Sequence, residues 1–210
     1  MQIYGFPISP FVRKVMVACA EKGLAAEVIP VNPGQPPEDF LAASPYRKIP
    51  ALADSDFTLA DSTAIVTYLE ALHPAPALLP ADPRARAMAV WFEEVADTIL
   101  TTEGGPMLFN RFVAPKFLGI EGDEAKAVEA EEKLATRLGY LDQQAATGEW
   151  LGDSFTIGDI AVASVFRSLA YAGWELDAAA YPSLAAWYGR VCARPGWQAA
   201  AAQEAAVMGG

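Results

Sequence analysis

A proline-rich connection divides this chain into two parts of different character. Between Pro74 and Pro83 the sequence PAPALLPADP carries four prolines and few polar groups, a composition that stiffens a connection and prevents regular structure. Short extended and helical segments alternate before this connection, whereas the pattern after it is helical throughout. We therefore predict two domains, residues 1–75 and 87–210, joined by a linker at residues 76–86.

The first domain is predicted to be an α/β unit with the order β-α-β-α-β-β-α and a mixed sheet. The segments MQIYGF and AAEVIPVN are typical of strands, and SPFVRKVMVACAEKG is typical of a helix capped by Ser9 with Pro10 at its first position. The segments IPALAD and FTLAD are separated by Ser55 and Asp56, which indicates a hairpin. The segment STAIVTYLEALHP then closes the domain as a helix.

The second domain is predicted to contain only helices. Asp82 and Pro83 begin a long helical segment, which the run Gly104, Gly105 and Pro106 is expected to break. In FTIGDIA, Thr156 and Asp159 have the spacing of a capping box, so we interpret Asp159 as structural rather than catalytic. The alanine-rich end of the chain is expected to fray.

Composition excludes several classes of function. The 210 residues are 53% hydrophobic, enough for a folded core, and 15 basic against 26 acidic residues give a net charge of -11. This charge is opposite to that of a phosphate-binding surface, so neither nucleic acid nor an anionic membrane is expected as a partner. The first residues lack the pattern of a secretory signal, which favours a cytoplasmic protein. Two distant cysteines, Cys19 and Cys192, and one histidine, His73, predict neither a disulfide framework nor a metal site.

A proline inside an apparent strand suggests a peptide-binding edge. Pro50 cannot donate to a strand ladder, so it belongs at an edge or bulge and leaves neighbouring backbone groups unpaired. Ile49 can offer its N–H and C=O to an extended peptide, although without further information an ordinary edge or loop proline is the favoured interpretation of Pro50. Asp61 and Ser62 likewise have two interpretations. They can cap the helix that follows, or hold the carboxylate and ammonium of an amino-acid ligand.

Ser9 is the third candidate. It precedes the first predicted helix and follows the first strand, at the edge where open α/β sheets bind ligands. It has no adjacent base to make it a nucleophile, because His73 lies at the end of another helix. Ser9 is better suited to donate a hydrogen bond to a ligand thiolate, whose pKa falls near a donor and a helix N-terminus. Arg13 and Lys14, which follow, are interpreted as a solvated or structural charge pair.

Four motifs in order give the chain a resemblance to a known family. The chain resembles the cytosolic glutathione transferases in the motifs ISPFVRKV, SPYRKIPAL, LADSTAIVTYLE and FTIGDIA. The class it resembles is serine-type, and either bacterial-like or theta- or tau-like. The resemblance implies a thioredoxin-like first domain, an all-helical second domain, a cis bond before Pro50, a homodimer and a role in detoxification. It also implies a role for each candidate residue in binding glutathione. Lys48 would steady the glycyl end, and the backbone of Ile49, before Pro50, would pair with the cysteinyl unit. Asp61 and Ser62 would hold the γ-glutamyl group, and Ser9 would activate the sulfur.

The resemblance leaves some questions open. Asp61 stands where many members have a longer Glu, and Tyr4 is a lesser candidate for the sulfur contact. For the small hydrophobic electrophile that would receive the thiolate, the sequence suggests an apolar wall made of Phe6, Ile8, Thr102, Met107 and Phe112. Aromatic and Met residues at such spacing are more often part of a core. A glutathione transferase is the expected enzyme. The alternatives are a non-catalytic glutathione-binding or scaffold protein and a glutathione-dependent isomerase, peroxidase or dehalogenase.

Overall fold

The computed structural model describes residues 1–32 and 34–209, and its contacts group the chain into two units. The first unit is Met1–Leu79 together with the chain from Ala193 onward, and the second is Pro80–Cys192. This division differs from the expected helical domain of residues 87–210. The difference arises because the last helix packs on the first unit, although it follows the second unit in sequence.

The first unit is built on a four-stranded mixed sheet with the strand order β2-β1-β3-β4. β1 runs parallel to β2 and antiparallel to β3, and β3 is antiparallel to β4. Asp54 pairs with Phe57 across the turn, where Ser55 has a φ of 57°, so the predicted hairpin is confirmed. The thioredoxin-like fold is confirmed with it. The strands are β1 Gln2–Tyr4, β2 Glu27–Ile29, β3 Ala51–Asp54 and β4 Phe57–Ala60.

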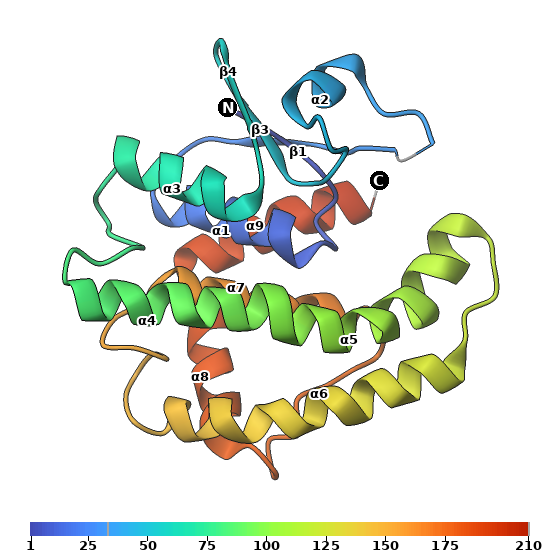
Figure 1. Cartoon of the computed structure of the whole chain (residues 1–210). Coiled ribbons are helices and arrows are strands. Elements are labelled where there is room, and N and C mark those ends of the chain that lie inside the picture. The colour runs from blue at the N-terminus through green and yellow to red at the C-terminus, as the bar shows by residue number, and fades with distance from the viewer. Residues whose placement is uncertain (33, 210) are drawn as a thin grey trace. The chain divides into compact units, whose positions relative to one another are not determined.

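Both faces of this sheet are covered by helices. Ile3 and Leu52 are paired in register and completely buried, and their strands contact α1 and α3. Successive strand residues point to opposite faces, so Tyr4 and Ala51 face the other way, into a cluster with Phe40 of α2. Figure 1 shows α1 and α3 on one side of the sheet and α2 on the other. These helices are α1 Pro10–Glu21, α2 Glu38–Ala43 and α3 Ser62–Leu72.

The C-terminal segment forms a helix, α9 Pro195–Met208, that packs against α1. The expectation that this alanine-rich end frays is therefore wrong. Glu204 of α9 forms an ion pair with Arg13 of α1, and Arg194, just before α9, forms another with Glu21 at 2.6 Å. Arg13 and Lys14 are both fully buried, so of the two interpretations of this pair the structural one is confirmed.

The first unit also holds the beginning of the proline-rich connection. Lys22, the C-cap of α1, donates from Nζ to the carbonyl oxygens of His73 at 2.7 Å and Pro76 at 2.9 Å. The same ammonium pairs with Glu70 of α3 at 2.6 Å. The Ala75–Pro76 peptide bond is cis. Part of the segment expected to be a linker is thus fixed to the first unit, because a nearly buried lysine satisfies carbonyls that have no partner in a strand or helix.

The second unit is helical, as predicted. Asp82 caps its first helix, accepting hydrogen bonds from the backbone N–H groups of Arg84 at 3.0 Å and Ala85 at 2.9 Å. Within the described residues, no helix is both long enough and apolar enough to cross a membrane. The helical segments are α4 Pro83–Glu94, η1 Val95–Leu100, α5 Thr101–Leu108, η2 Phe109–Leu118, α6 Glu124–Ala145, α7 Ile157–Ala170 and α8 Pro182–Cys192, where η marks π-helical hydrogen bonding.

The expected break at Gly104, Gly105 and Pro106 is wrong, because these residues lie inside α5. A Cβ on Gly104 would lie 3.0 Å from a methyl carbon of Leu169, so this glycine permits close packing of α5 on α7. The segments on either side of α5 are π-helical, and such wider turns accommodate irregular hydrogen bonding within a long helix. Packing between helices thus outweighs the low helix propensity of glycine and proline.

The capping box at the start of α7 is confirmed. Asp159 accepts from the backbone N–H of Thr156 at 2.9 Å, and the Thr156 hydroxyl accepts from the N–H of Gly158 at 3.3 Å. The same carboxylate accepts from the N–H of Leu151 at 3.0 Å and from the indole of Trp187 at 2.8 Å. Burial raises the pKa of Asp159. These bonds join α7 to α8 and to the loop before α7, which is a structural role.

Candidate functional site

Strand pairing brings two of the predicted binding segments together. Ala51 at the start of β3 pairs with Ala60 at the end of β4, so the residues just before β3 lie beside those just after β4. The backbone N–H of Asp61 donates to the carbonyl of Pro50 at 3.3 Å. Pro50 and Asp61 are therefore adjacent, although ten residues separate them in the printed sequence.

A cavity of about 680 Å³ opens at this junction. Its volume lies within the usual range for small-molecule sites, roughly 300–1,000 Å³. Five predicted site residues contribute to its wall, namely Lys48, Ile49, Pro50, Asp61 and Ser62. One basic and one acidic residue, Lys48 and Asp61, thus line the same cavity. The remaining lining residues are Phe11, Ala42, Ala43, Ser44, Pro45, Tyr46, Thr58, Leu59 and Ala60.

The segment before β3 presents backbone groups to this cavity. The Ile49–Pro50 peptide bond is cis, as the resemblance implies. Because β3 begins only at Ala51, Ile49 precedes the strand ladder. Ser44 fixes the preceding turn, since its buried hydroxyl donates to the carbonyl of Lys48 at 2.7 Å and accepts from the N–H of Lys48 at 3.0 Å. Sequence reasoning missed Ser44, although it stands at the start of the quoted motif SPYRKIPAL.

Asp61 serves as the cap of α3, which confirms the simpler of its two interpretations. Its carboxylate accepts from the N–H groups of Thr63 and Ala64, both at 3.0 Å and both through Oδ1. The cap therefore does not use Oδ2, and the Asp61 side chain is exposed and lines the cavity. Asp61 has a φ of 84°, a conformation that costs a non-glycine residue about 1–3 kcal/mol and is concentrated at functional sites. Ser62, the first residue of α3, is only 3% exposed.

Ser9 lies at the N-terminus of α1 with its hydroxyl not committed to the cap. Its backbone N–H donates to the carbonyl of Phe6 at 2.9 Å, while its side chain makes no capping hydrogen bond. Ser9 is half-buried and lies two residues before Phe11, which lines the cavity. The unpaired N–H groups and the dipole of a helix N-terminus favour an anion at this end of α1.

Tyr4, the other candidate for a sulfur contact, lies in the core. It is 5% exposed, and its ring centroid is 6.2 Å from that of Phe40. Its hydroxyl donates to the side-chain oxygen of Gln2 at 3.3 Å. Burial and the charge of Asp39 raise the pKa of Tyr4. A phenol that is buried and already hydrogen bonded is a weaker donor to a ligand than the Ser9 hydroxyl.

The residues predicted for an apolar wall are not all placed to meet a ligand. Phe6 is half-buried and Ile8 is 6% exposed, both in the loop before α1. In the second unit Thr102 is exposed, whereas Met107 is completely buried and belongs to the core rather than to an open surface. Phe112 is half-buried in η2. Its ring centroid lies 5.0 Å from that of Tyr171 and 5.8 Å from that of Phe117.

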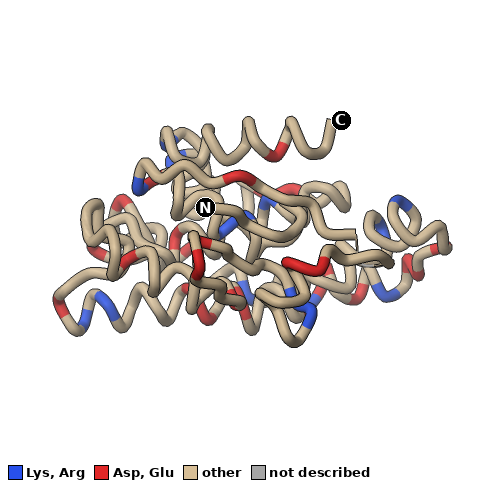
Figure 2. The backbone as a smooth tube through the Cα atoms, turned by 90° about the horizontal axis from the view of Figure 1, so that it is seen from above, with Lys and Arg blue, Asp and Glu red and all other residues tan. Residues whose placement is uncertain are grey.

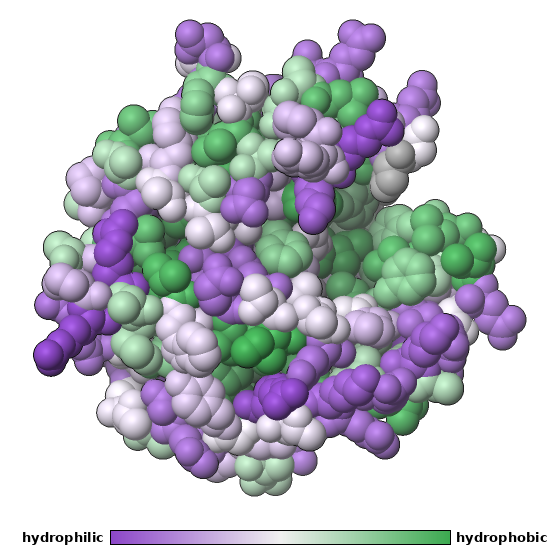
Figure 3. Space-filling model, in the orientation of Figure 1, coloured by the Kyte–Doolittle hydropathy of each residue, from purple (hydrophilic) through white to green (hydrophobic). Residues whose placement is uncertain are grey.

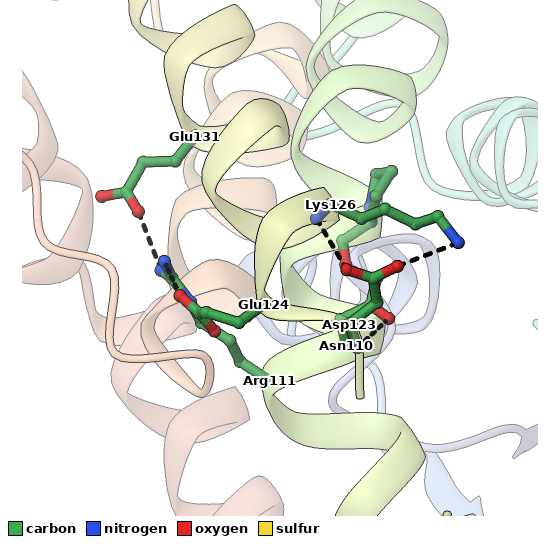
Figure 4. A network of polar contacts seen from close by, with 7 residues as sticks. Asn110, Arg111, Asp123, Glu124, Lys126 and Glu131 are labelled. Atoms are coloured by element: carbon green, nitrogen blue, oxygen red, sulfur yellow. Dashed lines mark hydrogen bonds and ion pairs between the residues drawn. The ribbon is translucent and has the colours of Figure 1, made fainter. Parts of the chain in front are cut away.

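A polar network holds η2, the segment that carries Phe112, against the start of α6. Arg111 donates to Glu124 at 2.7 Å and to Glu131 at 2.8 Å, and Figure 4 shows its guanidinium between these two carboxylates. These hydrogen bonds raise the pKa of Arg111 and lower that of Glu124. Asn110 accepts from the N–H of Asp123 at 2.9 Å. A Cβ on Gly122 would overlap the backbone oxygen of Asn110, so this close approach requires glycine.

Apolar side chains remain at the surface around this segment. Phe109 is 44% exposed and Ile120 is 52% exposed. Figure 3 shows hydrophobic surface gathered where Figure 1 places the turn between η2 and α6. The second unit therefore presents an apolar surface next to Phe112, of the kind that binds hydrophobic molecules.

Cysteine and histidine do not contribute to the site. Cys19 is 2% exposed, and burial raises the pKa of its thiol to about 12, so it is not a reactive thiolate at neutral pH. His73 is exposed at the end of α3. In the part of the chain that the structure describes, no group of three or more His, Cys, Asp or Glu residues is arranged to hold a metal ion.

Comparison with known proteins agrees with this geometry. Residues 3–77 match the family model "Glutathione S-transferase, N-terminal domain", and residues 120–190 match "Glutathione S-transferase, C-terminal domain". Glutathione S-transferase 3 of Zea mays is 34% identical, over 94% of this chain and 91% of its own length.

Solved structures give the same result. A glutathione S-transferase from Rhodospirillum rubrum superposes with a TM-score of 0.87 at 29% identity, covering 95% of this chain and 90% of the other. Glutathione S-transferase I, solved with lactoylglutathione, has a TM-score of 0.83 at 27% identity, covering 96% of this chain and 98% of the other. The fold, the family models and the sequence identity together show that this chain belongs to the glutathione S-transferase family.

Proposed function

We propose that the protein adds the thiolate of glutathione to an electrophilic carbon of small hydrophobic molecules. The observation that carries this proposal is the cavity of the first unit, whose lining includes the charged residues Lys48 and Asp61 together with Ile49 and Pro50. This is the arrangement that an extended zwitterionic peptide requires. A related transferase has been solved with a glutathione derivative, lactoylglutathione, which supports the choice of ligand.

Each part of glutathione has a partner in the proposed site. The Lys48 ammonium attracts the glycyl carboxylate, and the backbone of Ile49 pairs with the cysteinyl unit as an added strand would. The N-terminus of α3 with Ser62 receives the γ-glutamyl carboxylate, while Asp61 Oδ2 meets the γ-glutamyl ammonium. The cap and ligand roles of Asp61 are compatible, because the cap uses the other oxygen. Ser9 then donates a hydrogen bond to the sulfur.

The chemistry follows from holding the thiol ionised. A free cysteine thiol has a pKa of about 8.5, and a hydrogen-bond donor together with a helix N-terminus lowers it toward neutrality. The ionised sulfur is the nucleophile, and positioning it beside an apolar acceptor supplies much of the remaining rate enhancement.

Asp61→Asn separates the two roles of this residue. Asparagine caps helices as well as aspartate does and tolerates a positive φ, so the free energy of unfolding should change little. The lost charge should weaken glutathione binding about tenfold, as expected for one charge-assisted hydrogen bond of about 1.5 kcal/mol. Isothermal titration calorimetry with reduced glutathione measures this effect.

Asp82→Asn is the matched control for Asp61→Asn. Asp82 caps α4 through one carboxylate oxygen and the N–H groups two and three residues later, which is the geometry of Asp61. We expect Asp82→Asn to leave the affinity for glutathione unchanged. Equal affinities in Asp61→Asn and the unsubstituted protein would remove Asp61 from the binding site.

The proposed activity is tested by mixing the protein with glutathione and a chlorodinitrobenzene-type acceptor and following the conjugate. The expected result is saturable conjugation, with an apparent thiol pKa of bound glutathione below that of the free thiol. Retention on immobilised glutathione without a lowered thiol pKa would instead support the non-catalytic binding or scaffold function. A panel of electrophiles, followed by loss of free thiol, distinguishes conjugation from isomerase, peroxidase or dehalogenase activity.

We further propose a cytoplasmic homodimer. The proposal rests on the resemblance of the motifs to those of glutathione transferases. Exposed apolar side chains on α4 support it, since Met88 is 38% exposed and Trp91 is 45% exposed. The Trp91 indole donates to the hydroxyl of Tyr140 at 3.1 Å, so its ring is held in a fixed orientation at the surface. Gel filtration of the purified protein should show twice the monomer mass, and a monomeric peak at all concentrations would contradict the dimer.

A further inference from the structure

A buried ion pair links the last helix of the chain to the first. Arg13 of α1 is completely buried, and Glu204 of α9, its partner, is 1% exposed. Glu204 is the single charged residue in the sequence of α9, and Figure 2 shows that helix uncharged apart from one acidic position. A buried charge without a partner destabilises a protein, so each member of this pair requires the other.

Arg13 also contacts the loop that carries Ser9. From Nη2, Arg13 donates to the carbonyl of Pro7 at 3.3 Å, and Pro7 lies two residues before Ser9. The guanidinium carbon is 5.7 Å from the ring centroid of Trp197, which belongs to α9. The loop is closed by the backbone N–H of Ser9, which donates to the carbonyl of Phe6 at 2.9 Å, and α1 then begins with the bond from the Arg13 N–H to the carbonyl of Ser9 at 3.0 Å. The Arg13 side chain thus contacts both α9 and the loop that carries Ser9.

We propose that Glu204 and Arg13 are positioning residues, through which α9 holds the loop of residues 6–9 and so directs the Ser9 hydroxyl toward the glutathione sulfur. The inference rests on the proposed function of Ser9. Glu204 fixes the orientation of the Arg13 guanidinium, and the guanidinium fixes the Pro7 carbonyl. In this proposal the C-terminal helix supports the site of sulfur activation without touching the ligand.

A second ion pair joins the same two segments away from the Ser9 loop. Arg194, the residue before α9, donates to Glu21 at 3.0 Å and 2.6 Å. Glu21 is the last residue of α1, whereas Arg13 lies in its first turns. The two pairs therefore join the same helices at opposite ends of α1, and only the Arg13 pair is next to the Ser9 loop. The Glu21 pair is a matched control.

The test replaces each whole pair with apolar residues, because single substitutions would leave a buried charge unpaired. Replacing both members of a buried ion pair with apolar groups of similar volume is often neutral or stabilising. The test variant is Arg13→Met with Glu204→Leu. The control variant is Glu21→Leu with Arg194→Met. Both are prepared as full-length chains.

Two measurements decide the outcome. In the test variant, amide hydrogen exchange at Ser9 should accelerate at least tenfold, because the Pro7 carbonyl loses its donor and the loop opens more often. The apparent thiol pKa of bound glutathione should rise by about one unit, and the conjugation rate below that pKa should fall about tenfold. The control variant should match the unsubstituted protein in both measurements.

Unchanged exchange at Ser9 in the test variant would overturn the proposal, as would equal acceleration in both variants, which would indicate a general effect of α9 packing. Faster exchange without a shift in the thiol pKa would also overturn it, since Ser9 would then not depend on the loop. If the unsubstituted protein binds glutathione without conjugating it, the proposed function fails, but amide exchange at Ser9 in the test and control variants still decides whether Arg13 and Glu204 position the loop.

Discussion

Replacing Asp159 with alanine is expected to lower the free energy of unfolding by about 4 kcal/mol. The substitution removes the acceptor for three buried donors, the backbone N–H groups of Leu151 and Thr156 and the indole N–H of Trp187. Each buried donor left unsatisfied costs about 1–3 kcal/mol, and loss of the capping box adds to this. Urea denaturation followed by circular dichroism measures the difference.

The matched control for this prediction is Asp123→Ala. Asp123 also caps a helix, accepting from the N–H of Lys126 at 3.2 Å, but its side chain is 45% exposed. Water replaces the lost acceptor there, so we expect a clearly smaller loss of stability, that of an exposed N-cap alone. A loss for Asp159→Ala no larger than that for Asp123→Ala would show that the buried donors find other partners.

Local signals account for what the sequence predicted correctly. The capping box spans four residues, from Thr156 to Asp159, and the hairpin turn is the pair Ser55 and Asp56. Both depend on interactions between near neighbours, which a sequence pattern records directly. The cap role of Asp61 is of the same kind.

Distant contacts account for what the sequence did not predict. Arg13 and Glu204 are 191 positions apart, and nothing near either residue indicates that both are buried. The same partnership explains why α9 is a packed helix rather than a frayed end. Glycine has a low helix propensity, so the local sequence predicts a helix break at Gly104. In the structure Gly104 lies within a helix, because a Cβ there would crowd Leu169 of α7. Whether these segments are helical is decided by tertiary packing, and the helix propensity of the residues predicts it only weakly.

The candidate site depends on both local sequence signals and distant contacts. Lys48, Ile49, Asp61 and Ser62 were each identified from short motifs, whereas their grouping around one cavity depends on the register of β3 with β4. Ser44 was missed because its role is to hold the backbone of Lys48, and a buried serine in a turn has no distinctive pattern. Met107 was expected near a ligand but is buried, because its position on α5 faces the core.

Ser9→Ala is expected to lower the conjugation rate about 30-fold at neutral pH while leaving the affinity for glutathione nearly unchanged. The hydroxyl is free of any capping bond, so its loss leaves α1 intact and removes only the donor to the thiolate. A hydrogen bond to a charged group contributes about 2 kcal/mol, which corresponds to this factor in rate and to a rise of about 1.5 units in the thiol pKa. Steady-state rates across pH, together with calorimetry, measure both effects.

Tyr4→Phe distinguishes a serine-type from a tyrosine-type mechanism. The Tyr4 hydroxyl donates a hydrogen bond to the side-chain oxygen of Gln2 in β1, and the ring packs on Phe40. Removing the oxygen should therefore leave the pH profile of conjugation unchanged. If the thiolate depends instead on the phenol, Tyr4→Phe will raise the thiol pKa and Ser9→Ala will not. The two variants therefore give opposite results under the two mechanisms. The serine mechanism is preferred because α1 presents an uncommitted hydroxyl at its positive end, whereas Tyr4 is only 5% exposed.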